Sequence, residues 1–252
     1  DPDGGRIVFH AVLPTVVYPR AMRPRTSWDG LALLAGEEDI DAWEFEEKSE
    51  KESAGINLTE AMLGGGVTQL YLERLMLLEE VSGGRFPDPE PWRMLRLAKK
   101  HDRPVYHLEP PMDDDEWVAH LEREADQLTR WRTLLKIPRQ GRRFSKLLKI
   151  AKVSSSPPSD GPMELQVASA LAASWWWLLE ESLSPDLSLE RDQRIVARLR
   201  GAMADLRSRN GDDTTLMVPS LQVRIPTLIE LLDSGVEPET ANGGTTSDGE
   251  EE

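Results

Sequence analysis

The chain has 252 residues, 39% of them hydrophobic, and a formal net charge of −15. This is enough apolar material for the core of one large domain or two small ones, while the negative charge disfavours nucleic acid as a partner because phosphate would be repelled. The chain has no cysteine, which excludes disulfides and cysteine-based chemistry and fits a reducing, cytoplasmic location.

No segment is long and apolar enough to cross a membrane. The longest apolar stretch, Ala168–Leu179, is shorter than the roughly 20 residues that a membrane-spanning helix needs, so any membrane contact is expected to be peripheral. Because the chain begins at Asp1 rather than at Met, removal of residues before Asp1 is one interpretation that stays open.

The N-terminal region predicts two short strands. Arg6–Leu13 is mostly apolar and carries His10, which is typical of a buried strand. Ser27–Gly36 predicts a short helix with a serine cap and a closing glycine. Asp39–Phe45 alternates between polar and apolar residues, so it predicts a second strand that ends at the acidic run Glu46–Glu52.

A longer helical stretch is expected from Leu58 to about Val81. Three consecutive glycines at 64–66 interrupt it and would kink or split the helix. Trp92–Pro111 then predicts a helix, a turn and a strand, because its apolar helical face gives way to Pro104 and a short β-rich run. A helix that feeds directly into a strand is the repeating unit of an α/β fold.

The middle of the chain is expected to be helical and includes a basic segment. Asp113–Leu135 keeps one apolar face at helical spacing. Arg130–Lys152 then carries nine Lys or Arg residues and no acid. This segment could contact anionic lipid or another anionic surface. The favoured interpretation is a solvated helix that offsets local acidity or pairs with Glu46–Glu52.

The C-terminal half predicts a linker, helices and a returning strand. Ser154–Pro162 is the linker, Met163–Leu183 and Leu187–Ser208 are helices, Thr214–Val218 is a strand and Val223–Leu232 is a final helix.

From Asp233 the chain consists largely of Gly, Thr and acidic residues, and predicts disorder. We therefore expect one α/β domain over residues 1–232, with a helical middle at about 113–208 and a disordered acidic tail at 233–252.

His10 and Glu44 form the candidate chemical pair. If their two strands are parallel neighbours, the carboxyl ends lie at the same sheet edge, where open α/β sheets bind ligands. A histidine and a carboxylate there could hold a divalent metal or share a proton. The alternative is a buried, hydrogen-bonded histidine and a surface glutamate. Arg191 and Asp192, near the start of a helix, indicate a capping or buried ion pair.

Four segments in this order resemble the TraB/PrgY proteins, a group that also includes the TIKI, GumN and ChaN-like proteins. IVFHAV is similar to the family's first Gly-x-x-His strand, and DIDAWEF to the strand that ends in its acidic residue. WRMLRLAKKHDRPVYHLEPP resembles a family helix and strand, and PDLSLERDQRIVARL resembles its Glu-Arg-Asp helix. TLMVPSLQVRI falls where a second Gly-x-x-His would be.

The resemblance implies a small mixed central sheet surrounded by helices, with a helical middle insertion. It also implies a metal-dependent, peptidase-like hydrolase, or a regulator that sequesters a peptide signal. The positions that match the family's motifs are His10, Glu44 and Arg191 for catalysis, and Asp192 and Gln222 for binding. His10 and Glu44 would hold the divalent metal that is the candidate cofactor.

The chain departs from both histidine motifs. Ile7 replaces the glycine of the first, and Pro219 and Gln222 replace the glycine and the histidine of the second. Glutamine is a poor ligand for a zinc-like metal, and proline lacks a backbone donor. We therefore favour a non-catalytic binding or regulatory protein for a peptide or protein ligand.

Two alternatives stay open. One is an active hydrolase that uses His10 and Glu44, with Gln222 orienting the substrate. The other is a protein that docks a partner or an anionic membrane surface through residues 130–152. Neither the substrate nor the oligomeric state follows from the sequence.

Overall fold

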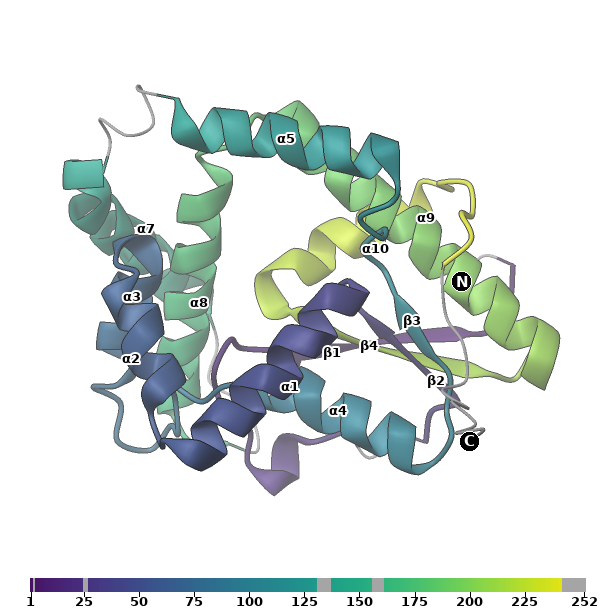
Figure 1. The fold of residues 1–252 in the computed structure, drawn as a ribbon, viewed down its shortest axis with the longest axis horizontal. Coiled ribbons are helices and arrows are strands. Elements are labelled where there is room, and N and C mark those ends of the chain that lie inside the picture. Colours follow the sequence, from purple (N-terminus) through teal and green to yellow (C-terminus); the bar gives the residue numbers. More distant parts are fainter. Residues whose placement is uncertain (2, 25–26, 131–136, 156–160, 242–252) are drawn as a thin grey trace.

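A four-stranded parallel sheet forms the centre of the computed structural model, which describes residues 1, 3–24, 27–130, 137–155 and 161–241. Its strands are β1 (Arg6–Val12), β2 (Gly30–Leu33), β3 (Val105–His107) and β4 (Thr215–Leu221). Their order in the sheet is β1-β4-β2-β3, and all three pairings are parallel (Figure 1). The predicted α/β class with a small central sheet is confirmed, and the sheet is parallel where a mixed one was expected.

Helices cover both faces of the sheet. On one face, α9 (Pro185–Asn210) and α10 (Ile225–Asp233) pack against side chains such as Leu216 and Val218 of β4. On the other face, α1 (Glu37–Glu52) and α4 (Pro89–Lys100) pack against Met217, which has the opposite orientation in the same strand. This alternation follows from the two-residue period of a strand.

A second group of helices lies beside the sheet and has its own core. It consists of α2 (Ile56–Leu63), α3 (Gly66–Leu75), α7 (Gln140–Ser154) and α8 (Glu164–Glu180) (Figure 1). Buried Tyr71, Phe144 and Leu171 belong to this core, and Leu13 and Val16, which follow β1, connect it to the sheet.

The remaining elements connect these layers. Figure 1 shows α5 (Asp115–Thr129) running from the second helical group to α9. Three short 3-10 helices complete the described elements: η1 (Arg20–Met22), η2 (Ile137–Arg139) and η3 (Gln222–Arg224). Within the described part of the chain, none of the helices has the length and apolar character required to cross a membrane.

Most long elements agree with the sequence. Trp92–Pro111 forms α4 and β3, Thr214–Val218 falls in β4, and the predicted helices Met163–Leu183 and Leu187–Ser208 correspond to α8 and α9. The glycines at 64–66 split the predicted long helix into α2 and α3, because Gly65 and Gly66 adopt positive φ angles of 72° and 68°.

Two predictions near the N-terminus were wrong. Ser27–Gly36 contains β2 rather than a helix, and all four residues of that strand are buried between helices on both faces. A short apolar run does not distinguish a buried parallel strand from a helix, and tertiary burial decides it here.

Asp39–Phe45 lies within α1 and is not a strand. The Asp39 side chain accepts a hydrogen bond from the Gly36 N–H at 2.8 Å and so caps this helix. The acidic residues of the first turn also stabilise the helix, because they lie at the positive end of its dipole. The run Glu46–Glu52, where the predicted strand was expected to end, continues the same helix.

Other predicted segments are only partly covered. The predicted helix Asp113–Leu135 is observed as α5, and residues 131–136 lie outside the described residues. The same holds for residues 156–160 of the predicted linker and 242–252 of the predicted tail.

The described part of the predicted tail packs on α9, which corrects the expectation of disorder for residues 234–241. The Glu239 N–H donates to the Ala197 carbonyl at 2.9 Å, and Arg198 donates to the Thr240 carbonyl at 3.2 Å. Gly201 makes this approach possible, since a Cβ there would lie 1.8 Å from the Glu239 carbonyl oxygen.

We predict that Gly201→Ala detaches the segment 236–241 from α9. The methyl group would overlap the Glu239 backbone, so we expect faster hydrogen exchange in this segment and a loss of about 1–2 kcal/mol in the free energy of unfolding. Hydrogen exchange read by mass spectrometry, together with urea unfolding, measures both.

Gly141→Ala is the matched control. Gly141 is also helical, but a Cβ there meets nothing within 4 Å, so the better helix propensity of alanine should stabilise the protein by up to about 1 kcal/mol. Unchanged exchange of residues 236–241 in the Gly201→Ala variant would contradict the expected contact.

Candidate functional site

The carboxyl ends of the parallel strands meet at one edge of the sheet, where α/β proteins bind ligands. Val12, Leu33, His107 and Leu221 are the last residues of the four strands. Two groups of charged side chains lie near this edge. We call them the His10 cluster (His10, Glu90 and Arg93) and the Arg191 cluster (Glu124, Glu180, Arg191, Asp192 and Arg224).

His10 faces α4 and lies beside a buried carboxylate. Its Nε2 is 3.5 Å from Oε2 of Glu90, whose side chain is only 1% exposed, and Arg93 reaches the same oxygen at 2.6 Å. The Tyr18 ring contacts the imidazole edge to face, with 5.8 Å between centroids. Burial raises the pKa of Glu90, but His10 and Arg93 outweigh it and leave the pKa below its usual value. Glu90 is therefore held as an anion.

Glu44 lies on α1, not at the end of a strand, and the structure does not bring it to His10. Its exposed carboxylate pairs with Lys99 Nζ at 3.1 Å. Lys99 and Glu90 are nine residues apart on α4, which separates them by about 13 Å along the helix axis. His10 and Glu44 therefore contact opposite ends of α4. Among the described residues, no three His, Cys, Asp or Glu side chains are grouped so that they could hold a metal ion.

The loop after β1 is tied to the start of α4. The Thr15 N–H donates to the Asp88 carboxylate at 2.5 Å, and Thr15 has a φ of 58°, an uncommon conformation for a β-branched residue. Burial raises the pKa of Asp88 to about 6. The Tyr71 hydroxyl donates to the Pro14 carbonyl at 2.6 Å, so the same loop is also fixed to α3.

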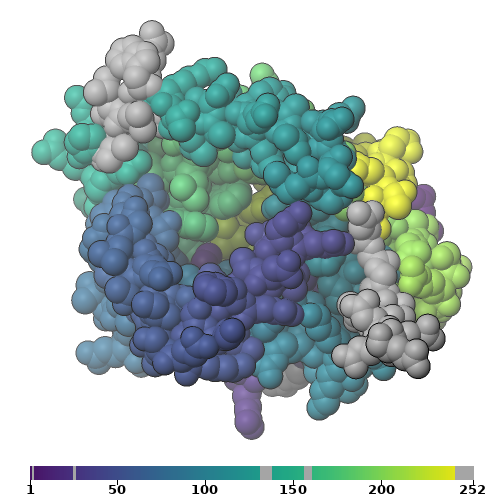
Figure 2. All heavy atoms as spheres, in the orientation of Figure 1, coloured from purple at the N-terminus to yellow at the C-terminus, as the bar shows by residue number. Residues whose placement is uncertain are grey.

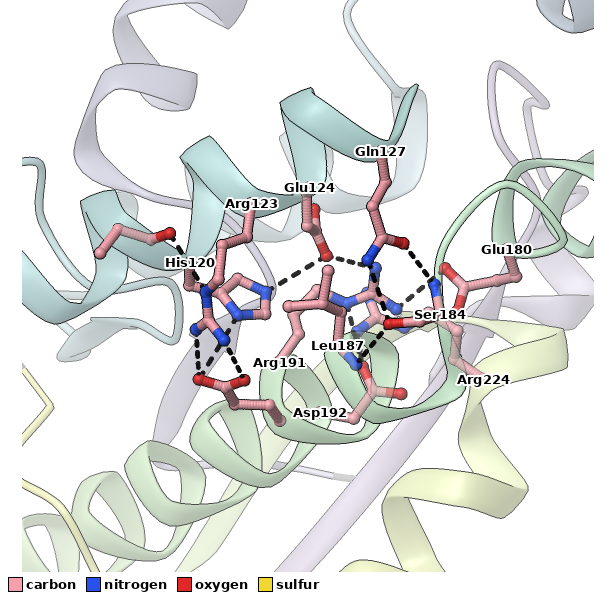
Figure 3. A network of polar contacts seen from close by, with 12 residues as sticks. His120, Arg123, Glu124, Gln127, Glu180, Ser184, Leu187, Arg191, Asp192 and Arg224 are labelled. Carbon is pink, nitrogen blue, oxygen red and sulfur yellow. Dashed lines mark hydrogen bonds and ion pairs between the residues drawn. The ribbon is translucent and has the colours of Figure 1, made fainter. Parts of the chain in front are cut away.

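The Arg191 cluster is a network of ion pairs between α5, α8, α9 and η3 (Figure 3). Arg191 donates to Glu180 at 2.9 Å, to Glu124 at 3.4 Å and to Asp192 at 3.3 Å. Arg224 donates to the same Asp192 oxygen as Arg191, at 2.6 Å. The predicted buried ion pair of Arg191 and Asp192 is confirmed.

The Trp176 ring lies under both arginines. The guanidinium carbons of Arg191 and Arg224 are 5.4 and 4.8 Å from its ring centroid, which allows cation–π attraction. Trp176 belongs to the Trp175–Trp177 run of α8, so this run supports the charged network as well as the core of the second helical group.

Polar side chains of α5 bind the turn between α8 and α9 (Figure 3). His120 contacts Glu124 at 3.2 Å, and Arg123 pairs with Glu190 at 2.6 Å. Gln127 accepts a hydrogen bond from the Ser184 N–H at 2.7 Å. The buried Trp117 stacks on His120, with 5.2 Å between ring centroids. The Arg123–Glu190 pair reaches α9, and the Gln127–Ser184 hydrogen bond reaches the residue before α9. These two contacts fix α5 over the Arg191 cluster.

Glu109 follows β3 at the same edge of the sheet. Burial raises its pKa to about 7, and the nearby Asp39 carboxylate acts in the same direction. The positive charges of Arg224 and Arg191 oppose this rise in the pKa of Glu109. Glu109 therefore changes charge near neutral pH.

A pocket of about 730 Å³ opens beside the Arg191 cluster. Asp192, Arg224 and Glu180 line it together with apolar side chains that include Trp177 and Leu189. A smaller pocket of about 200 Å³ shares Trp176 and Arg224 with it and reaches the strand ends at Leu33 and Leu221. Figure 2 shows a hollow in the surface between α5 and α1, and atoms of α8 and α10 are visible inside it.

Gln222 is separate from the His10 cluster in its contacts. It lies in η3 directly after β4, and its amide oxygen accepts a hydrogen bond from the Ser169 hydroxyl at 2.8 Å. Pro219 pairs in register with His10 across the two strands. The two departures from the second histidine motif therefore lie on β4 and just beyond its end.

Most of the described part of the basic segment lies in α7, and no ion pair between it and the acidic run is found among the described residues. Arg143 pairs with Glu181 of the α8–α9 turn, whereas Glu47 of the acidic run pairs with Arg96 and Lys51. Lys146, like Arg142 and Lys149, is exposed. Docking of this segment on an anionic surface stays a prediction.

Several residues in or next to the two clusters were missed in the sequence. They are Glu90, Glu109, Trp176, Glu180 and Arg224. Glu109 had a usable signal, because it directly follows a predicted strand and the strand-end rule that selected His10 and Glu44 applies to it equally. Glu90 resembles an ordinary acid in the first turn of a helix.

Searches of protein-family models, of curated proteins and of solved structures each returned no match to this chain. The relationship to the TraB/PrgY group therefore stays a prediction from the sequence motifs, and the motif at Asp39–Phe45 lies in helix α1 instead of the expected strand.

We predict that Asp192→Asn destabilises the protein by about 3 kcal/mol. The change removes the carboxylate between two buried guanidinium groups and leaves Arg224 without its carboxylate partner. Urea unfolding measures the loss. Glu190→Gln, one residue away, breaks an exposed pair with Arg123 and should cost much less. Equal losses in the two variants would show that the buried network is not special.

We also predict that stability falls as the pH rises from about 4.5 to 7. The pKa of Glu109 is about 7 in the folded chain and near 4.3 in the unfolded chain, so only the folded state keeps the proton in this range. The native state is stabilised below the unfolded pKa and loses this contribution as the pH passes through the folded pKa, by a few kcal/mol at most.

Glu109→Gln tests this pH dependence. The variant cannot lose the proton, so its free energy of unfolding should fall less than that of the native protein between pH 5 and pH 8. Part of the fall should remain, because Asp88 also has a raised pKa. Urea unfolding at the two pH values measures the difference, and identical slopes would contradict the assignment.

Proposed function

We propose that the chain is a TraB/PrgY-like domain that binds a peptide or protein ligand without catalysing a reaction. The observation that carries this proposal is the pocket of about 730 Å³ beside Asp192 and Arg224. Its size is typical of a ligand site, as is its combination of apolar walls with a few convergent polar groups.

The ion pairs prepare this pocket for binding. Arg224 and Asp192 hold each other, and Arg191 fixes Glu180, so the polar groups are oriented before a ligand arrives. Trp177 and Leu189 contribute apolar surface. A peptide offers both the apolar side chains and the backbone hydrogen-bonding groups that such a lining can engage.

The contacts of the other candidate residues support binding over hydrolysis. His10 lies against Glu90, Glu44 pairs with Lys99, and Arg191 has three carboxylate neighbours. The hydrolase hypothesis needs His10 and Glu44 to act on one metal or one water, which requires them to be close.

We also propose a cytoplasmic location, which cell fractionation would test.

Leu189→Glu tests the proposed pocket. Leu189 is 46% exposed and lines the pocket, so the substitution introduces a charge there without disturbing the core or the ion pairs. Heptapeptides selected from a phage library against the native chain should bind the variant at least about tenfold more weakly, as measured by fluorescence polarisation.

Ile229→Glu is the control, because Ile229 is similarly exposed at 43% and does not line this pocket. It should bind the selected peptides like the native chain. Failure to select any peptide, or equal binding to both variants, would refute the pocket. Mass spectrometry of the peptides after incubation with Mn²⁺ or Zn²⁺ tests the non-catalytic part, since cleavage would contradict it.

A further inference from the structure

A second concave surface lies along α4 and shares no lining residue with the pocket beside Asp192. We call it the α4 groove. It has a volume of about 670 Å³ and is lined by four basic side chains, Arg85, Arg93, Arg96 and Lys100, and by one carboxylate, Glu47. The lining therefore carries a charge of 4 − 1 = +3, in a chain whose net charge is −15.

Three of these cations form a row on one side of α4. Arg93, Arg96 and Lys100 are spaced i, i+3 and i+7, which places them on one helix face over about 10 Å. Arg93 is held by the buried Glu90 at 2.6 Å, and Arg96 by Glu47 at 3.0 Å. Both guanidinium groups are thus oriented by carboxylates that leave some of their donors free.

The other two cations have no carboxylate partner. Arg85 and Lys100 are exposed, and neither has an ion pair within the described part of the chain. The helix dipole favours a lysine in the last turn of α4 and so accounts for Lys100. It does not account for Arg85, which lies on the loop before α4 and reaches the same groove.

An aromatic and proline-rich wall completes the groove. Trp92 donates its Nε1–H to Glu47 at 3.2 Å and packs edge to face on Trp43, with 6.3 Å between centroids. Phe86 and the prolines at 87 and 89 continue this wall. The groove therefore offers a fixed apolar surface beside a row of positive charge.

We propose that the α4 groove binds an acidic peptide segment of a partner protein in an extended conformation. In an extended chain alternate side chains on one face are about 7 Å apart, so two carboxylates at i and i+2 fit within the 10 Å row of cations. An apolar side chain next to them would pack on Trp92. The positive lining also attracts a negatively charged segment, although the protein as a whole is negative.

The test uses a fluorescein-labelled octapeptide in which Glu alternates with Leu or Phe, and the full chain. We expect saturable binding in fluorescence polarisation that weakens when NaCl is raised from about 50 to 300 mM, since salt screens exposed charges. The same peptide with Gln in place of Glu should bind at least about tenfold more weakly. The double variant Arg85→Glu/Lys100→Glu should lose a similar factor for the acidic peptide.

Arg142→Glu/Lys146→Glu on α7 is the matched control. It makes the same change in net charge at exposed positions outside the groove, and it should bind the peptide like the native chain. Leu189→Glu should also bind normally, which separates this site from the proposed pocket. Thermal unfolding verifies that each variant is folded.

Three results would overturn the proposal. One is native-like binding by the Arg85→Glu/Lys100→Glu variant, and another is equal binding of the Gln peptide. The third is binding of tripolyphosphate that depends on Arg85 and Lys100 while no peptide binds, which would assign the groove to a small anion.

Discussion

The carboxylate of Asp192 joins α9 to η3, the short helix that directly follows the central strand β4. It lies between Arg191 of α9 and Arg224 of η3, and both arginines rest on Trp176 of α8. Without that carboxylate two guanidinium groups would share one ring with less opposing charge, at a high cost in a buried setting. The contact between α9 and η3 therefore depends on this carboxylate, and Asp192 and Arg224 both line the pocket beside it.

Elements whose pattern is long or sharply bounded could be predicted from the sequence. The helix and strand of Trp92–Pro111 and the helices α8 and α9 have periodic apolar faces, caps or breakers that act locally. The exchange of strand and helix between residues 27 and 52 has a non-local cause. Gly30–Leu33 is a strand because β4 pairs with it and helices bury both of its faces, and no neighbour in sequence carries that information.

The same limit governs the candidate site. The pair of Arg191 and Asp192 was predictable because the residues are adjacent, whereas Arg224 joins them from 32 positions away. Glu44 was wrongly expected beside His10 because Asp39–Phe45 was predicted to be a strand. In the structure this segment is helical, Glu44 pairs with Lys99, and Glu90 lies beside His10. Glu109 shows that a correct strand is sufficient, because its position follows directly from β3.

The two concave surfaces use charge in opposite ways. Beside Asp192 the carboxylates and guanidinium groups are paired with one another. We therefore expect them to affect ligand binding mainly through the shape of the pocket and the orientation of its polar groups. In the α4 groove Glu47 and Glu90 orient two arginines, while Arg85 and Lys100 remain without carboxylates from the described chain. Exposed cations that a folded chain of charge −15 leaves unpaired retain their attraction for an external anion. If the two proposed sites bind ligands, we therefore expect the α4 groove to select for charge and the pocket to select for shape.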